Sequence, residues 1–202
     1  MTEASTPMEH PAEIERRLAI AAQSGDRAAF EEIVRRLKGP LYRFIRRYVG
    51  DADEAYDILQ EAFVAAWLAL PRFDGRHAFS IWLRAIALNK CRDHGRRRAV
   101  RRRIHMLFCL DSDLWQSGTP DPAASDHPED PRLRLLDEAI AALPRRYKEP
   151  LLLTLTAGLT QQQAAVQLHI TTKAVEMRIR RARRKLGESL AGTTALALAP
   201  EM

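Results

Sequence analysis

Apolar residues recur along most of this chain at intervals of three and four, the spacing that places side chains on one face of an α-helix. The clearest stripe begins after Asp26, a residue suited to capping a helix. It predicts one helix, or two helices divided near Pro40, with an inner face of Phe30, Ile33, Val34, Leu37, Leu41, Phe44, Ile45 and Tyr48. This pattern favours an all-α fold class.

Two more helices are predicted in the N-terminal half. One runs from about Asp53 to Leu70, with an inner face of Leu59, Ala62, Phe63, Ala66, Trp67 and Leu70. The other runs from about Arg76 into an arginine-rich stretch and buries Phe79, Leu83 and Ile86. The apolar faces of these helices can share the core of one small bundle.

The C-terminal part begins with two further predicted helices. Leu133, Leu136, Ile140 and Leu143 mark the first of them. Pro144 then starts a new turn, and the apolar run Leu151–Leu155 marks the second.

The segment that follows has the pattern of a helix-turn-helix. Thr160 and Gln163 have the spacing of a capping box, which predicts a short helix that ends near Leu168. After a turn at residues 169–170, another helix starts at Thr171 or Thr172 and runs to about residue 186. The second helix of such a pair enters the DNA major groove. We expect it to bury Val175, Ile179, Ala182 and Leu186 and to expose Glu176, Met177, Arg180, Arg181, Arg183 and Arg184.

Bulk composition narrows the class of protein. The chain has 202 residues, 46% of them hydrophobic, which is enough for two small domains. A formal net charge of +6 indicates nucleic acid or an anionic membrane surface as the partner. No apolar run reaches the roughly 18–20 residues of a bilayer span, and the first eleven residues lack the pattern of a signal peptide. We therefore expect a cytoplasmic protein without membrane insertion.

Charge divides the chain into segments. Nine Lys and Arg residues lie between Arg84 and Arg103, and seven lie between Lys173 and Lys185. The segment between them, from Asp111 to Asp130, has six acidic residues, three prolines and no Lys or Arg. We interpret this as a flexible N-terminus (1–11), a first helical domain (12–108), a flexible acidic linker (109–131), a second helical domain (132–190) and a flexible tail (191–202).

The residues of the two basic segments suit different forms of DNA. Arg180 and Arg181 can bind guanine edges or phosphates of a duplex. Melted DNA instead requires a cationic groove and residues that trap an unstacked base. Candidates for that task are Phe73 and the helical stripe formed by Asn89, Arg92 and Arg96. On the outer face of the helix before them, an acidic patch with apolar neighbours suits a protein partner and contains Asp57, Gln60, Glu61, Val64 and Leu68.

These residues, taken together, resemble the extracytoplasmic-function (ECF) family of sigma factors. Residues 57–63 (DILQEAF) resemble the D-x-x-Q-E-x-F stretch of the family's second conserved region. The strings at 73–75 (FDG), 79–83 (FSIWL) and 86–89 (IALN) resemble the continuation of that region. Residues 175–183 (VEMRIRRAR) resemble the recognition helix of the fourth region. The resemblance covers about residues 14–104 and 132–188, in the family's order.

The resemblance implies a sigma region 2 bundle and a region 4 helix-turn-helix, without catalytic activity or cofactors. It implies docking on the β′ clamp of core RNA polymerase by Asp57, Gln60, Glu61, Phe63 and Val64. It implies minus-ten DNA contacts by Phe73, Asn89, Arg92 and Arg96. It implies minus-thirty-five DNA contacts by Gln161, Gln162, Thr172, Lys173, Glu176, Met177, Arg180 and Arg181. The second domain is expected on the β flap, and an anti-sigma factor is an expected partner.

The recognition helix departs from the family's usual pattern. It begins Lys173-Ala174-Val175, where the family often has Gly-Thr-Val. Glu176 and Met177 occupy base-facing positions that often hold Arg or Ser. Glu can accept a hydrogen bond from cytosine N4, so the promoter sequence is left open.

Three other classes of protein remain to be weighed. A stand-alone helix-turn-helix regulator explains the second domain and leaves the first without a task. Cys91, His94, His105 and Cys109 have spacings that superficially suit zinc, but the six arginines between His94 and His105 would repel a cation. We therefore expect no metal. No common catalytic motif is present, and we expect no enzyme.

Overall fold

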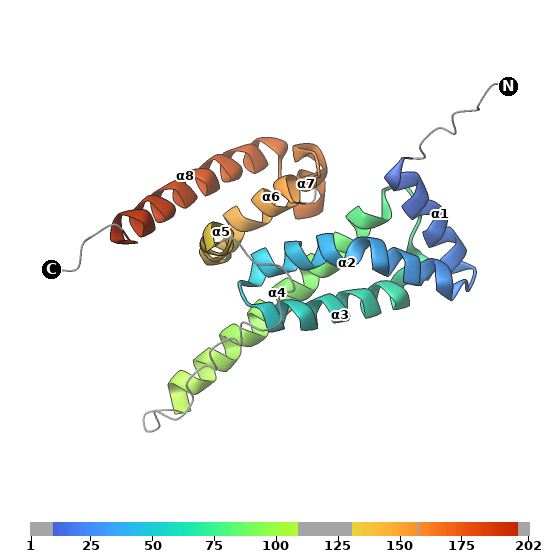
Figure 1. Cartoon of the computed structure of the whole chain (residues 1–202), viewed down its shortest axis with the longest axis horizontal. Helices are drawn as coiled ribbons and strands as arrows, with labels where there is room; N and C mark the ends of the chain where they lie inside the picture. The colour runs from blue at the N-terminus through green and yellow to red at the C-terminus, as the bar shows by residue number, and fades with distance from the viewer. Residues whose placement is uncertain (1–9, 109–130, 157, 198–202) are drawn as a thin grey trace.

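The computed structural model describes residues 10–108, 131–156 and 158–197. All regular elements in these ranges are helical, and they form two bundles (Figure 1). The first bundle contains α1 (Pro11–Gln23), α2 (Arg27–Val49), α3 (Ala52–Ala69), the 3-10 turn η1 (Leu70–Arg72) and α4 (Phe79–Phe108). The second contains α5 (Pro131–Ala142), α6 (Arg145–Leu155), α7 (Gln161–Leu168) and α8 (Thr172–Ala197). The predicted all-α fold is confirmed.

Helix α2 settles the alternative left open at Pro40, because it is a single helix with that proline inside it. The Asp26 carboxylate caps the helix as predicted by accepting a hydrogen bond from the backbone N–H of Ala29 at 3.1 Å. Gly50 ends the helix with φ +87°, a left-handed conformation that favours glycine. The whole predicted apolar stripe therefore lies along one continuous helix.

The other boundaries in the first bundle differ from the predicted ones in detail. Helix α4 begins at Phe79 and not near Arg76, because residues 73–78 form an irregular connection. Trp67 was expected on the inner face of α3, and this is wrong. Its side chain is 37% exposed and packs edge-on against Phe30, with ring centroids 4.8 Å apart. Helix α1 is not predicted by the apolar pattern, because it buries only alanines, Ala19 and Ala22.

The core of the first bundle lies between α2, α3 and α4 and is closed at one end by α1 and η1. Its largest fully buried side chains are Ile33, Phe44, Ile45, Phe79, Leu83 and Leu88. Burial of each such side chain stabilises the fold by about 1.5–3 kcal/mol. This core fixes the outward faces of α3 and α4, where the candidate functional residues lie.

The second bundle is built around α6, whose Leu151, Leu152 and Leu153 are all buried. The capping box at the start of α7 is confirmed. The Thr160 side chain accepts from the N–H of Gln163, and the Gln163 side chain accepts from the N–H of Thr160. His169 then makes the turn with φ +54°. The Thr171 side chain caps α8 by accepting from the N–H of residue 174. The helix itself therefore starts at Thr172, one of the two predicted positions.

Helix α8 is longer than predicted. Val175, Ile179 and Ala182 are buried, as expected, and Leu186 is partly buried against the core. The helix continues to Ala197, beyond the predicted end near residue 186. Residues 191–197, which the prediction assigned to the tail, are therefore helical, and residues 198–202 lie outside the described ranges.

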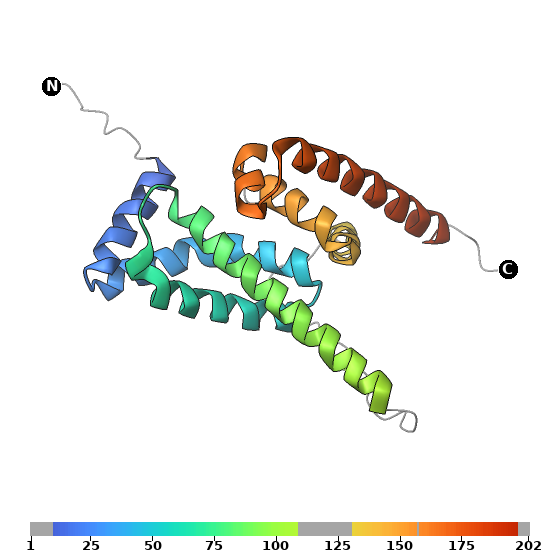
Figure 2. The same cartoon turned by 180° about the vertical axis from the view of Figure 1, so that it is seen from behind.

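The two bundles are packed against each other. Helices α5 and α6 contact α2, and in both views the second bundle lies on the side of α2 away from α3 (Figures 1 and 2). In the ranges that the structure describes, no helix is long and apolar enough to cross a lipid bilayer. The predicted acidic linker falls almost entirely outside these ranges.

Candidate DNA-binding and polymerase-binding surfaces

The recognition helix presents its predicted DNA-facing residues to solvent. Six predicted contact residues of α8 and its start are exposed, namely Thr172, Lys173, Glu176, Met177, Arg180 and Arg181. Burial of Val175, Ile179 and Ala182 holds this face outward. Within it, Arg180 forms an ion pair with Glu176 at 3.2 Å. A hydrogen bond with Arg181 lowers the pKa of Tyr147, so this arginine reaches back to α6.

Helix α7 adds two more predicted residues, Gln161 and Gln162, at its exposed first turn. Gln162 also lines a cleft of about 480 Å³ between the bundles. Across this cleft lie residues of the first bundle: Phe73, Asp74, His77, Ile81, Trp82 and Ala85. The fold thus brings residues predicted for two different promoter elements to one cleft.

Phe73 does not have the exposure that a base contact requires. Its side chain is 6% exposed and packs against Phe79 and Trp82, with ring centroids 5.2 and 5.3 Å away. In this arrangement Phe73 is a core residue that closes one wall of the cleft. The same wall includes Ile81 and Trp82, which are sequence neighbours in the first turn of α4.

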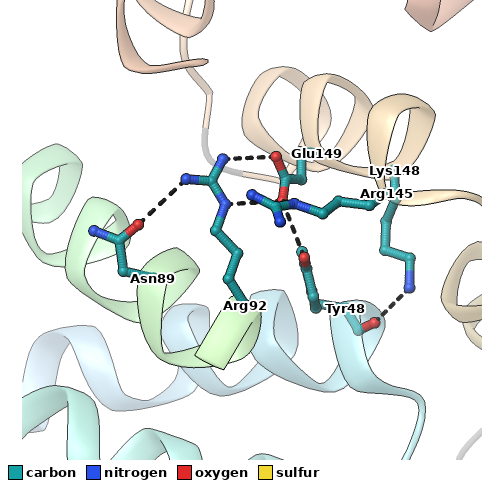
Figure 3. Close-up of polar contacts among 6 residues, drawn as sticks. All are labelled: Tyr48, Asn89, Arg92, Arg145, Lys148 and Glu149. Atoms are coloured by element: carbon teal, nitrogen blue, oxygen red, sulfur yellow. Dashed lines mark hydrogen bonds and ion pairs between the residues drawn. The ribbon is translucent and has the colours of Figure 1, made fainter. Parts of the chain in front are cut away.

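Helix α4 places Asn89, Arg92 and Arg96 on one stripe, as the sequence spacing requires. Asn89 is exposed, and its Oδ1 accepts a hydrogen bond from Arg92 Nη1 at 3.3 Å. The Arg96 side chain is 72% exposed and is paired with Asp93. Arg92 differs from both, because its guanidinium is directed at the second bundle, where it meets Glu149 (Figure 3).

Glu149 is the centre of a polar cluster that sequence reasoning missed. The residue is 5% exposed and receives hydrogen bonds from Tyr48, Arg92 and Arg145 (Figure 3). Burial raises the pKa of Glu149, but hydrogen bonds and charges of the two arginines outweigh burial and hold it below its ordinary value. The only sequence signal was that Lys148 and Glu149 interrupt the buried side of α6.

The predicted polymerase-binding residues gather on the exposed face of α3. A shallow groove there is lined by Asp57, Gln60, Glu61, Val64, Ala65, Leu68 and Lys90. Val64 and Leu68 are 59% and 75% exposed, large fractions for apolar side chains. Lys90 of α4 forms an ion pair with Glu61 at 3.2 Å. Phe63 is only 9% exposed, so its side chain packs in the core beneath the groove and does not line it.

The residues considered for zinc do not form a site among those described. Cys91 is buried, and burial raises its pKa to about 12, so its thiol stays protonated near neutral pH. His94 lies 3.8 Å from Glu54. No three His, Cys, Asp or Glu side chains gather in the described ranges. Cys109 and the His105 side chain lie outside them.

Comparison with known families matches both bundles. The family described as Sigma-70 region 2 matches residues 33–101, and the family described as Sigma-70, region 4 matches residues 133–186. The first match covers α3 and most of α4. The second covers the helix-turn-helix.

Individual proteins are similar over nearly the whole chain. RNA polymerase sigma factor CnrH of Cupriavidus metallidurans is 36% identical over 90% of this chain and 96% of its own length. ECF RNA polymerase sigma factor SigF of Caulobacter vibrioides is 31% identical over 82% of this chain and 93% of its own. A solved structure of CnrH in complex with the cytosolic domain of CnrY has a TM-score of 0.63 and 32% identity, covering 89% of this chain and 98% of that one. The chain therefore belongs to the ECF family of RNA polymerase sigma factors, which are DNA-binding and not enzymes.

Proposed function

We propose that the two bundles divide the work of promoter recognition. The first docks on core RNA polymerase through α3 and holds the separated minus-ten strands with Asn89, Arg92 and Arg96. The second reads the minus-thirty-five duplex with α7 and α8. The observation that carries this proposal is the pairing, in one chain, of an exposed acidic and apolar groove on α3 with an exposed basic helix-turn-helix.

The groove on α3 suits a protein partner better than DNA. Asp57 and Glu61 would repel phosphates, whereas a basic partner is attracted to them. Val64 and Leu68 add apolar area beside these charges, which gives a docked helix a surface to bury. The occupant in this proposal is the coiled coil of the β′ clamp, and the second bundle sits on the β flap.

The basic helix α8 suits duplex DNA. Arg180 and Arg181 can donate to guanine edges in the major groove, and Lys173 can neutralise a phosphate. Glu176 can accept from a cytosine amino group once Arg180 moves to a phosphate or base. The linker, in this proposal, passes through the active-site cleft and RNA exit path and is displaced by growing RNA.

An anti-sigma factor is part of the proposal. CnrH, which is similar over most of its length, has been solved with the cytosolic domain of CnrY. A protein of that class would bind this chain in the cytoplasm and keep it from core polymerase.

The deciding experiment is run-off transcription with purified core polymerase on a library of genomic promoter fragments. We expect the chain to direct initiation at a subset of them. Without core polymerase, it should bind duplex promoters weakly, whereas a stand-alone regulator would bind them tightly. Failure to associate with core polymerase would refute the proposal.

The docking face is tested by Asp57→Ala and Glu61→Ala. Each should weaken binding to core polymerase by roughly threefold to tenfold, because each removes one charge from the contact surface. Glu31→Ala on α2 is the matched control, since Glu31 is also an exposed acid and lies outside the groove. Affinities are measured with labelled core polymerase. If all three variants bind with wild-type affinity, the assignment of this docking face is wrong.

A further inference from the structure

Helix α1 holds the irregular connection (residues 73–78) that joins η1 to α4, although none of the predicted contact residues belongs to this helix. Gln23, its last residue, donates from Nε2 to the backbone carbonyls of Leu70 at 2.8 Å and Phe73 at 2.7 Å. A primary amide has two N–H donors, so both are used. A helix leaves its last carbonyls without helical partners. Gln23 therefore closes the end of η1 from a distant part of the chain.

The other end of the connection is held by the same helix. Glu15 of α1 accepts a hydrogen bond through Oε2 from the backbone N–H of Ser80, in the first turn of α4, at 2.9 Å. A carboxylate is favoured there because the first N–H groups of a helix are unpaired and carry partial positive charge. Glu15 and Gln23 are eight residues apart, or about 12 Å along the helix axis. Helix α1 therefore fixes both ends of the connection.

The backbone of the connection is also constrained between these ends. The Asp74 carboxylate accepts from the backbone N–H of Arg76 at 3.0 Å, and Gly75 has φ +69°. Arg16 of α1 lies beside this turn, since a Cβ placed on Gly75 would be 3.5 Å from Arg16 Nε. The connection therefore has a defined conformation, in which the side chains of Asp74, Arg76 and His77 are exposed.

This conformation places the connection beside the predicted minus-ten residues. Asp74 and His77 line the same cleft as Trp82 of α4. Asn89 follows Trp82 by two helical turns, so both lie on one face of α4. Arg76 is 80% exposed and is paired with Asp74 at 3.2 Å. Arg76 and His77 can donate to base edges or phosphates of a strand that lies along this face.

We infer that Gln23 is a positioning residue for minus-ten recognition, because it holds the connection in the conformation that presents Arg76 and His77 to the melted strand. This inference rests on the proposed function and extends the minus-ten machinery to a helix that precedes the matched residues 33–101. Gln23 acts through the two backbone carbonyls and not by touching DNA.

The core of the first bundle does not depend on this contact. Gln23 is an exposed residue, whereas Ile33, Phe44 and Leu83 are fully buried among other side chains. Loss of the two hydrogen bonds should therefore leave the bundle folded and allow the connection to sample other conformations. This separates an effect on positioning from an effect on folding.

Three variants isolate the donor group of Gln23. Gln23→Glu keeps the size of the side chain but cannot donate when ionised, whereas Gln23→Lys again supplies N–H donors. Ser24→Ala is the matched control at the neighbouring position. It removes a hydrogen bond from Ser24 Oγ to the carbonyl of Ile20, which lies in α1 and not in the connection.

Hydrogen–deuterium exchange of the full-length chain without polymerase measures the hold of α1 on the connection. In Gln23→Glu, the amides of residues 73–80 should exchange about fivefold faster than in the wild type. Gln23→Lys and Ser24→Ala should exchange at wild-type rates in this segment. Circular dichroism confirms that each variant remains helical.

Run-off transcription with core polymerase measures the consequence for DNA. The template is a promoter on which the wild type initiates, with the positions of its minus-ten element changed one at a time. Discrimination between the original and the changed elements should fall about fivefold in Gln23→Glu and stay at the wild-type level in Gln23→Lys and Ser24→Ala. A new charge at position 23 acts on all templates alike, because attraction to phosphates is independent of sequence. The ratio between templates therefore reports positioning.

The outcomes separate this inference from the proposed function. Unchanged exchange in Gln23→Glu would overturn the inference, and so would an equal loss of initiation on every template. Gln23→Lys that behaves like Gln23→Glu would also overturn it, because the donor would then not be the cause. If the wild type initiates and Gln23→Glu discriminates equally well, the proposed function stands and only this inference falls. A wild type that initiates on no promoter would refute the proposed function itself.

Discussion

The two bundles differ in how fully their predicted DNA-binding residues are exposed. In the second bundle, Arg180 and Arg181 lie on an exposed helix face held outward by a buried apolar stripe. In the first, Arg92 is paired with a buried carboxylate and Phe73 is packed between two aromatic rings. The contrast shows that the predicted contact residues of α8 are exposed, whereas two of the four predicted minus-ten residues, Phe73 and Arg92, are held by other residues of the chain.

The largest effect is expected from Phe73→Ala, which tests whether Phe73 is a core residue or a DNA contact. If Phe73 is a core residue, the substitution leaves a cavity beside Phe79 and should lower the free energy of unfolding by about 3–5 kcal/mol. Urea denaturation followed by circular dichroism measures the change. Val166→Ala is the control, because Val166 lines the same cleft and is 72% exposed. Unchanged stability, together with lost promoter opening, would instead make Phe73 a direct DNA contact.

Arg181→Ala tests whether the exposed face of α8 in the second bundle reads the upstream duplex. Loss of one arginine contact to a base should cost about 1–3 kcal/mol, or roughly fivefold to 150-fold in affinity for the correct upstream duplex. Binding to single-stranded DNA should not change. The measurement is run-off transcription by the holoenzyme on matched and altered upstream sequences. An equal loss on every sequence, with a shallower dependence on salt, would show that Arg181 binds a phosphate rather than a base.

The smallest expected effect is a pH dependence that reports whether the bundles stay docked in solution. Burial lowers the pKa of Lys148 from 10.5 to about 8, so above pH 8 the folded chain releases a proton that the unfolded chain retains. Stability should therefore rise between pH 8 and 9, by at most about 1 kcal/mol. Above pH 9, ionisation of Cys91 in the unfolded chain alone opposes this gain, because burial raises its pKa from 9.0 to about 12.

Thermal unfolding across this pH range, with Lys148→Met as the comparison, checks the prediction. The variant has no amine to titrate, so its stability should not rise between pH 8 and 9. A rise of the same size in both proteins would assign the effect to another group.

Helices α2 to α8 and the helix-turn-helix could be predicted from the sequence alone. The capping box at Thr160 and Gln163, the inward face of α8 and the exposed groove residues of α3 follow from spacing along one helix. These features are local, because 3.6 residues per turn fix which side chains share a face. The resemblance in motifs then assigned the family, and the comparisons confirmed it.

Other features required the tertiary structure. Pro40 ended no helix, because the apolar residues on both sides of it pack into one core, which outweighs local preference. Helix α8 continued past its last predicted apolar position, although residues 187–189 are exposed. Spacing alone also left open whether Phe73 would face solvent or the rings that bury it.

The contact between Arg92 and Glu149 joins residues 57 positions apart. No periodic pattern encodes a pair at that separation, because it exists only when two separately folded bundles dock. The sequence by itself determined the family and the helices that carry the candidate contacts, because both follow from local motifs and spacing. Only the docked structure decided that Arg92 of the first bundle meets Glu149 of the second.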